Sequence, residues 1–268
     1  MSEGCELPCC PVLGVGVTPV DLTAAVDRVE SWIGRGHREY ICVTGVHGVM
    51  ECQRDPHLRD VHNRAGMVVP DGMPLVWISK ARGFKDVSRV YGPDFMLRVC
   101  ERTLHTGRRH YFYGGAEGVP ELLKEALEAR FPGLQVVGTH SPPFRELTDA
   151  EVLEVAAEIN CAAPDVVWVG LSTPKQERWM DRLRPHLDAS ALIGVGAAFD
   201  FHAGLKPQAP DWMKRVGLEW LFRMASEPRR LGPRYLRNNP TFVGRLIVEE
   251  LGRALGRLPM APGGRVSS

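Results

Sequence analysis

The stretch of residues 167–177, which reads VWVGLSTPKQE, most constrains what this chain can fold into. An apolar run typical of a buried strand ends in small residues, and a proline then begins a helix with Lys, Gln and Glu in its first turn. A strand that leads into a helix in this way places backbone N–H groups and polar side chains at the carboxyl edge of a sheet, where open α/β folds bind ligands. Residues 67–72 and 193–200 repeat the pattern, so the sequence predicts one active-site cleft built from three strand ends.

Strand and helix patterns alternate along most of the chain, which predicts an α/β fold: a mainly parallel sheet with helices on both faces (Rossmann-like), plus a helical C-terminal appendage. The expected strands are residues 40–46, 67–70, 110–114, 134–138, 165–171 and 191–195. The expected helices are residues 21–34, 56–65, 74–82, 93–105, 119–131, 149–161 and 174–187.

The pattern changes after residue 205, where the strands stop and prolines separate what we expect to be short helical pieces. These prolines are Pro207, Pro210, Pro228, Pro233 and Pro240. We therefore divide the chain into an α/β catalytic domain (1–205), a basic, amphipathic helical appendage (206–258) and a disordered tail (259–268).

Charge is distributed unevenly along the chain, although the net charge is only +1. Residues 206–257 contain eleven Lys or Arg and five Asp or Glu, a surplus of six positive charges. A basic C-terminal quarter indicates an anionic partner: phosphate, a membrane surface or nucleic acid. Within it, residues 241–258 are typical of an amphipathic helix, which either packs against the body or contacts a membrane.

The composition is that of an ordinary globular protein of 268 residues, with 44% hydrophobic residues. Its longest apolar runs fall short of the ~20 residues that span a bilayer, and the first residues lack the pattern of a signal peptide. The seven cysteines form no C-x-x-C pair, which favours free thiols in a reducing cytosol.

Two charged residues near strand ends are the main catalytic candidates. Asp71 lies in a Pro-Asp-Gly sequence, which is a favoured turn, but here the turn ends an apolar run and precedes a helix. A carboxylate at that edge can accept a proton from an attacking hydroxyl if partial desolvation raises its pKa. Arg89 precedes a Gly-Pro helix start, and its planar guanidinium suits a diphosphate, although a surface arginine fits the same sequence.

Three further positions follow predicted strands. Gly114 and Gly115 lie in a glycine turn before a helix, where backbone N–H groups can hold a phosphate. This turn is neither G-x-G-x-x-G nor a Walker loop. His47 follows Thr44 closely and is either a base or a hydrogen-bonded structural histidine.

Together these segments resemble the WecG/TagA/CpsF family of bacterial glycosyltransferases over residues 40–235, most of the chain. The resemblance rests on six ordered blocks: VPDG (69–72), RVYGPD (89–94), VGLSTPKQE (169–177), GVGAAFDFHAG (194–204), AP (209–210) with GLEWLFR (217–223), and EPRRL (227–231).

The resemblance implies transfer of a sugar from a UDP-sugar to a polyprenyl-diphosphate-linked sugar acceptor at the cytoplasmic membrane face, for cell-surface polysaccharide synthesis. It implies inversion at the anomeric carbon, no metal and no other cofactor, and peripheral association with an anionic membrane surface. The general base falls on Asp71. The resemblance places donor or acceptor contacts on Thr44, Arg89 and Gln176. The full set of expected substrate-binding residues also includes His47, Gly114, Gly115, Asp200, Arg223, Arg230 and Arg234.

One departure from the family pattern concerns the acceptor side. Many relatives have a Thr-x-Asn arrangement where this chain has Thr44 followed by Gly45, Val46 and His47, so His47 is expected to take part of that role. The sugar, the acceptor glycan and self-association stay open. The alternative is another nucleotide-binding α/β class, such as a nucleic-acid-binding module that uses the basic C-terminal region.

Overall fold

The computed structural model describes residues 7–215 and 217–256, apart from the side chains of Asp211, Arg215 and Arg230. The predicted tail, residues 259–268, lies outside the described residues. At the centre is a six-stranded parallel sheet with the strand order β4-β3-β8-β7-β5-β6. Its strands are β3 (Glu39–Thr44), β4 (Met67–Pro70), β5 (Arg109–Gly114), β6 (Gln135–His140), β7 (Val166–Gly170) and β8 (Ala191–Gly194). All six predicted strands are therefore present.

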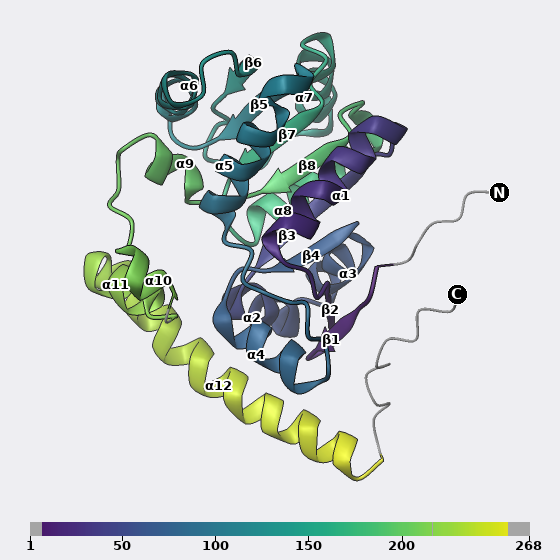
Figure 1. Ribbon diagram of the computed structural model, residues 1–268, viewed down its shortest axis with the longest axis vertical. Coiled ribbons are helices and arrows are strands. Elements are labelled where there is room, and N and C mark those ends of the chain that lie inside the picture. The colour runs from purple at the N-terminus through teal and green to yellow at the C-terminus, as the bar shows by residue number, and fades with distance from the viewer. Residues whose placement is uncertain (1–6, 216, 257–268) are drawn as a thin grey trace, which may run out of the picture.

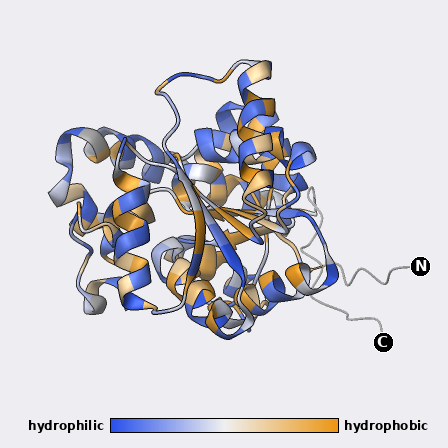
Figure 2. Cartoon of the chain, turned by 90° about the horizontal axis from the view of Figure 1, so that it is seen from above, coloured by the Kyte–Doolittle hydropathy of each residue, from blue (hydrophilic) through white to orange (hydrophobic). Residues whose placement is uncertain are grey.

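Helices cover both faces of this sheet, as the alternating pattern predicts (Figure 1). Successive strand residues point to opposite faces, so Tyr40 and Cys42 join one hydrophobic core and Ile41 joins the other. The Ile41 side is covered by α1 (Leu22–Arg35), α5 (Gly92–Thr103), α6 (Val119–Arg130) and α9 (Ala198–His202). The opposite side is covered by α2 (Val46–Arg54), α3 (Pro56–Arg64), α4 (Met73–Ala81), α7 (Asp149–Cys161) and α8 (Lys175–Leu183). Figure 2 shows the largely hydrophobic strands at the centre, between the helices.

Two elements were not expected from the sequence. The predicted strand over residues 40–46 ends at Thr44, and α2 begins at Val46, so His47 lies in a helix and not at a strand end. Val49 and Met50 are buried one helical turn further on, which explains why a helix forms here. An antiparallel hairpin of β1 (Cys10–Val12) and β2 (Val15–Val17) also precedes the main sheet.

The C-terminal region contains α10 (Asp211–Arg215), α11 (Glu219–Ser226) and α12 (Pro228–Ala254). The prediction of short pieces was wrong for α12, which is one helix of 27 residues with Pro233 and Pro240 inside it. Each internal proline removes a backbone hydrogen bond, and contacts with the body offset this loss. The helix runs along α2 and α4 towards the β1–β2 hairpin (Figure 1).

The α12 helix carries apolar side chains on two sides. Leu231 and Phe242 are buried, and Leu246 packs against the core beneath the helix. On the outer side, Ile247 and Leu251 are 54% and 58% exposed. The sequence left packing and membrane contact as alternatives; the helix packs one apolar side against the body and exposes a second.

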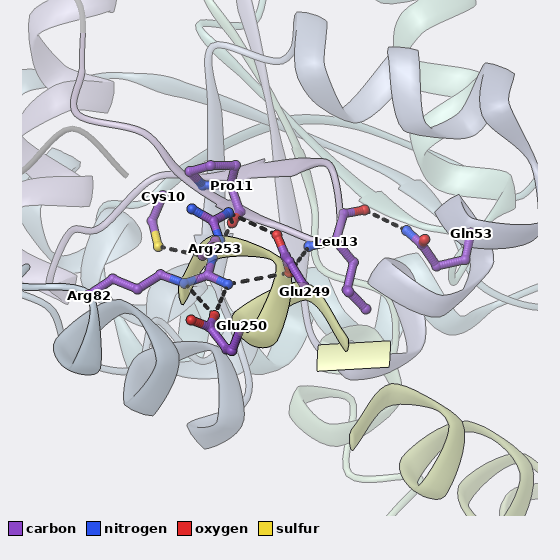
Figure 3. Close-up of polar contacts among 8 residues, drawn as sticks. All are labelled: Cys10, Pro11, Leu13, Gln53, Arg82, Glu249, Glu250 and Arg253. Carbon is purple, nitrogen blue, oxygen red and sulfur yellow. Dashed lines mark hydrogen bonds and ion pairs between the residues drawn. The ribbon is translucent and has the colours of Figure 1, made fainter. Parts of the chain in front are cut away.

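A polar network fastens the far end of α12 to the body (Figure 3). Arg82, at the end of α4, pairs with Glu250 and lies 3.3 Å from Glu249, and it also donates to the carbonyl of Pro11. Arg253 lies 2.8 Å from Glu249 and donates to the same carbonyl. The side chains of Arg82, Arg253 and Glu249 are 6%, 9% and 11% exposed, so the pairs with Glu249 are largely shielded from water, whereas Glu250 is 47% exposed.

Candidate active site

A cavity of 770 Å³ opens at the carboxyl ends of the strands, between the sheet and the C-terminal helices. The adjacent strand ends β3, β4 and β8 form its floor, and residues of α11 and α12 form its roof. Seven of the predicted site residues line it: His47, Asp71, Arg89, Gln176, Asp200, Arg223 and Arg234. The three segments that the sequence pattern placed in one cleft, which follow β4, β7 and β8, all contribute lining residues.

Asp71 is held at the floor of this cavity by backbone contacts. Its N–H donates to the carbonyl of Thr44 (2.9 Å), which joins the ends of β3 and β4. The N–H of Gly92 donates to Oδ1 of Asp71 at 3.3 Å. Burial raises the pKa of Asp71, and the charge of Glu219 raises it further, while Arg89 and Arg223 act in the opposite direction. A carboxylate with a raised pKa at a strand end has the properties of a general base.

Arg89 connects Asp71 to the C-terminal region. Its Nε donates to the carbonyl of Asp71, and its Nη2 lies 2.5 Å from Glu219 Oε2 and 3.9 Å from Asp71 Oδ1. The guanidinium also lies over the ring of Tyr91, 4.2 Å from the centroid. Arg89 is therefore paired more closely with Glu219 than with Asp71.

His47 lies in the first turn of α2, where it contacts the C-terminal helix. Its Nδ1 is 3.1 Å from Nδ2 of Asn238 and 3.6 Å from the carboxylate of Glu51. Burial lowers the pKa of His47 to about 4, and the nearby charge of Arg234 contributes. Asn238 also accepts from Arg54 at 2.6 Å, so this part of the site ties α12 to α2.

Gln176 and Thr44 both have buried polar side chains. Gln176 is 3% exposed and lines the cavity from the first turn of α8. Thr44 is 2% exposed. Its methyl group lies so close to Gly48 that a Cβ at Gly48 would be only 2.8 Å from it. The Thr44 hydroxyl has no hydrogen-bond partner among the described residues.

Arginines approach from the C-terminal helices. Arg223 of α11 lies 5.6 Å from the ring of Phe201, and Arg234 of α12 lies 5.6 Å from the ring of Tyr235. Both arginines line the cavity. The third predicted arginine, Arg230, lies in α12, and its side chain is outside the described part of the structure.

A second cavity, of 1110 Å³, adjoins the first and shares Ser172, Gly196, Ala197 and Asp200 with it. Gly115 lines this second cavity, but its N–H donates to the carbonyl of Gly170 (3.0 Å). Gly114 lines neither cavity, and a Cβ there would lie 2.7 Å from the Gly170 backbone. Gly114 thus permits close packing of β5 and β7.

Asp200 lies between the two cavities, where it is paired with Lys206 at 2.7 Å. Lys206 also lies 3.7 Å from Glu227, the residue that precedes α12. Asp200 is therefore linked to the start of the C-terminal helix.

Sequence reasoning missed Glu219, Tyr235 and Asn238, which all line the first cavity. Glu219 lies within the GLEWLFR block, on which the family resemblance partly rests, and it is 5% exposed although it is charged. The sequence did not indicate that this glutamate is buried. Asn238 is 3% exposed in a helix of mostly charged and apolar residues, and only the structure shows that this asparagine is buried.

Residues 7–215 and 217–256 contain no group of three or more His, Cys, Asp or Glu side chains arranged to hold a metal ion. In the same part of the chain, no helix has both the length and the hydropathy that crossing a bilayer requires.

Known proteins match this chain over most of its length. The profile of the "Glycosyl transferase WecG/TagA/CpsF family" matches residues 10–255. An N-acetylglucosaminyldiphosphoundecaprenol N-acetyl-beta-D-mannosaminyltransferase of Bacillus spizizenii (strain W23) is 26% identical over 91% of this chain and 93% of its own length. The proteins with the same name from Bacillus subtilis (strain 168) and Staphylococcus aureus (strain MW2) are both 28% identical, over 78% and 68% of this chain and 80% and 68% of their own lengths.

Proposed function

Because this chain belongs to the WecG/TagA/CpsF family of glycosyltransferases, we propose that it transfers an N-acetylhexosamine from a UDP-sugar to a polyprenyl-diphosphate-linked sugar. The names of the relatives make N-acetylmannosamine the first donor sugar to test and a GlcNAc-diphosphate lipid the first acceptor. In this proposal the product serves cell-surface polysaccharide synthesis.

The observation that carries the proposal is the Asp71 carboxylate at the cavity floor, with its raised pKa. Asp71 takes the proton from a hydroxyl of the acceptor sugar while that oxygen attacks the anomeric carbon. The bond from this carbon to the diphosphate breaks on the opposite side, and UDP leaves with the electron pair. A single displacement of this kind inverts the anomeric configuration.

The leaving diphosphate develops negative charge, which has to be neutralised in the transition state. Arg223 and Arg234 line the same cavity as Asp71 and come from the C-terminal helices, where the basic surplus lies. Arginine guanidinium groups bind diphosphate oxygens through paired hydrogen bonds. These arginines are our reason to propose that transfer proceeds without a metal ion.

The two adjoining cavities accommodate two parts of the donor. The nucleoside occupies the second cavity, beside Gly115, and the diphosphate crosses the shared rim at Ser172 and Asp200. The sugar then lies near Asp71, where the acceptor enters from the other side.

A lipid-linked acceptor requires access to a membrane surface. The outer side of α12, away from the cavity, exposes Leu236, Ile247, Val248, Leu251 and Leu255. Trp212 is exposed on α10, and tryptophan favours the membrane–water interface. We propose that this side rests on the cytoplasmic face of the membrane, while the cavity lies on the opposite side of α12.

The function is tested with purified protein, UDP-N-acetylmannosamine and a short-chain GlcNAc-diphosphate lipid in excess EDTA. We expect a disaccharide-diphosphate lipid with an inverted anomeric linkage, identified by mass spectrometry and NMR. Absence of product with every UDP-N-acetylhexosamine tested contradicts the proposed function. Product that forms only with added magnesium contradicts metal independence alone.

A further inference from the structure

Glu177 is a completely buried carboxylate next to Gln176 in the first turn of α8. We propose that Glu177 is a positioning residue that holds the Gln176 side-chain amide so that its oxygen accepts a hydrogen bond from an O–H or N–H group of the bound sugar nucleotide. The inference rests on the proposed function for the identity of the ligand.

The contacts of Glu177 determine which way the Gln176 amide points. Oε1 of Glu177 accepts from Oγ1 of Thr173 at 2.7 Å and from Nε2 of Gln176 at 3.1 Å. Because the amide nitrogen is the donor in the second bond, it must face Glu177. Oε1 of Gln176 therefore points away from Glu177.

Two glycines at and just after the end of β8 leave room for the amide in this position. A Cβ on Gly194, the last residue of β8, would lie 3.1 Å from Nε2 of Gln176, a tight contact that the glycine avoids. A Cβ on Gly196 would lie 3.4 Å from Oε1, which places the oxygen beside the turn shared by the two cavities. The oxygen thus lies near the shared rim, between the positions proposed for the sugar and the nucleoside.

Oε1 of Gln176 is buried and has no hydrogen-bond partner among the described residues. Leaving a buried polar atom without a hydrogen-bond partner costs free energy, so we expect the bound ligand to donate a hydrogen bond to this oxygen. A carbonyl oxygen only accepts, and diphosphate oxygens also accept at neutral pH. Gln176 therefore recognises a hydroxyl or N–H of the sugar or base, and the arginines recognise the diphosphate.

The first test is a double-mutant cycle with UDP-N-acetylmannosamine as the varied substrate. Glu177→Met, which keeps the length of the side chain but removes the acceptor oxygens, is expected to lower kcat/KM by about 5- to 150-fold, the range for a buried polar group left unpaired. Gln176→Ala with Glu177→Met should be no slower than Gln176→Ala alone, because Glu177 acts through Gln176. Losses that multiply in the double variant overturn the proposal. Glu154→Gln, an exposed glutamate of α7, is the matched control and should leave the kinetics unchanged.

A second test identifies the group that Gln176 binds. Wild-type protein should discriminate against one deoxy or N-methylated UDP-sugar analogue that lacks the required donor, and Gln176→Ala should use that analogue and the parent about equally well. Retention of the full discrimination in Gln176→Ala contradicts the assigned contact.

A third measurement separates this inference from the proposed function. The side-chain NH₂ signal of Gln176 in ¹⁵N-labelled wild-type protein, assigned by its loss in Gln176→Ala, should exchange slowly with solvent. It should exchange faster in Glu177→Met, which lacks the acceptor, whatever reaction the protein catalyses. Equal exchange in both proteins overturns the role of Glu177, whereas a wild type without transfer activity overturns only the proposed function.

Discussion

Nη2 of Arg89 lies 2.5 Å from the carboxylate of Glu219 but 3.9 Å from that of Asp71, so the arginine at the cavity floor is paired with a residue of α11. The negative charge of Glu219 raises the pKa of Asp71, in opposition to the charge of Arg89, which lowers it. The C-terminal region thereby contributes to the basicity of a residue in the α/β body.

Substitution Glu219→Gln removes this competing charge. Arg89 then pairs with Asp71, and the pKa of Asp71 falls. We expect the acid limb of the pH profile of kcat/KM to move to lower pH, with slower turnover at neutral pH because the base is weaker. An acid limb that stays in place or moves upward contradicts this account, and Glu154→Gln again serves as the exposed control.

Substitution Asp71→Asn removes the proposed base and keeps the shape of the side chain. We expect kcat to fall by about two to four decades, the usual contribution of a positioned base. UDP binding, measured by calorimetry, should persist. Asp86→Asn, at an exposed aspartate in the segment before Arg89, is the control. Near-normal turnover in folded Asp71→Asn protein would rule out the assignment.

The same substitution has a separate effect on stability. The folded-state pKa of Asp71 is above its ordinary value of 3.8, so the stability that Asp71 contributes is present below that value and is lost as pH rises through the folded pKa. Asp71→Asn does not ionise and avoids this loss. We expect the variant to have a higher Tm than the wild type at pH 7, with the difference shrinking towards pH 4. A lower Tm at pH 7 contradicts the direction of the pKa shift.

His47 has the opposite pH dependence. Its pKa falls from 6.5 to about 4 in the folded protein, so the unfolded chain binds a proton that the folded chain does not. Stability is therefore lost as pH falls from about 6.5 towards 4. In His47→Gln, the urea midpoint should fall less between pH 7 and pH 5 than in the wild type. The buried His110, with a pKa also lowered to about 4, is present in both proteins and cancels in the comparison.

The outer side of α12 is tested with vesicles of phosphatidylglycerol and phosphatidylcholine. Ile247→Ser with Leu251→Ser should weaken sedimentation with these vesicles and leave transfer to a soluble acceptor analogue unchanged. Leu153→Ser, at an equally exposed leucine of α7, is the control. Binding by the wild type should also weaken as salt rises, because exposed charges are screened over about 10 Å at 0.1 M salt. Unchanged sedimentation of the double variant contradicts the membrane contact.

Local sequence patterns predicted much of the fold and part of the candidate site. The apolar run before Asp71 and the proline before Lys175 mark strand-to-helix transitions, and both occur where expected. The short strands β1 and β2 have only three residues each and leave no periodic signal. The α12 helix was hidden by Pro233 and Pro240, whose local preference is overridden by contacts with distant segments.

The site residues that pattern missed depend on distant pairing. Glu219 follows Arg89 by 130 positions, and Asn238 follows His47 by 191. No local spacing reports such pairs, because they are created when the C-terminal helices meet the body. Asp71 directly follows β4 and Gln176 lies in the first turn of α8, so local pattern could place both at the carboxyl edge of the sheet.

The position of the cavity roof in the sequence has a consequence for synthesis in the cell. A ribosome that has completed β8 has made the whole parallel sheet and Asp71, but Arg223, Arg234 and Asn238 are still to be translated. The network of Arg82 with Glu249 and Glu250 forms later still, after nearly all of α12 has left the exit tunnel. The nascent chain therefore contains every strand of the sheet before it contains the residues that close the cavity, and a chain that ends within α12 lacks part of the roof.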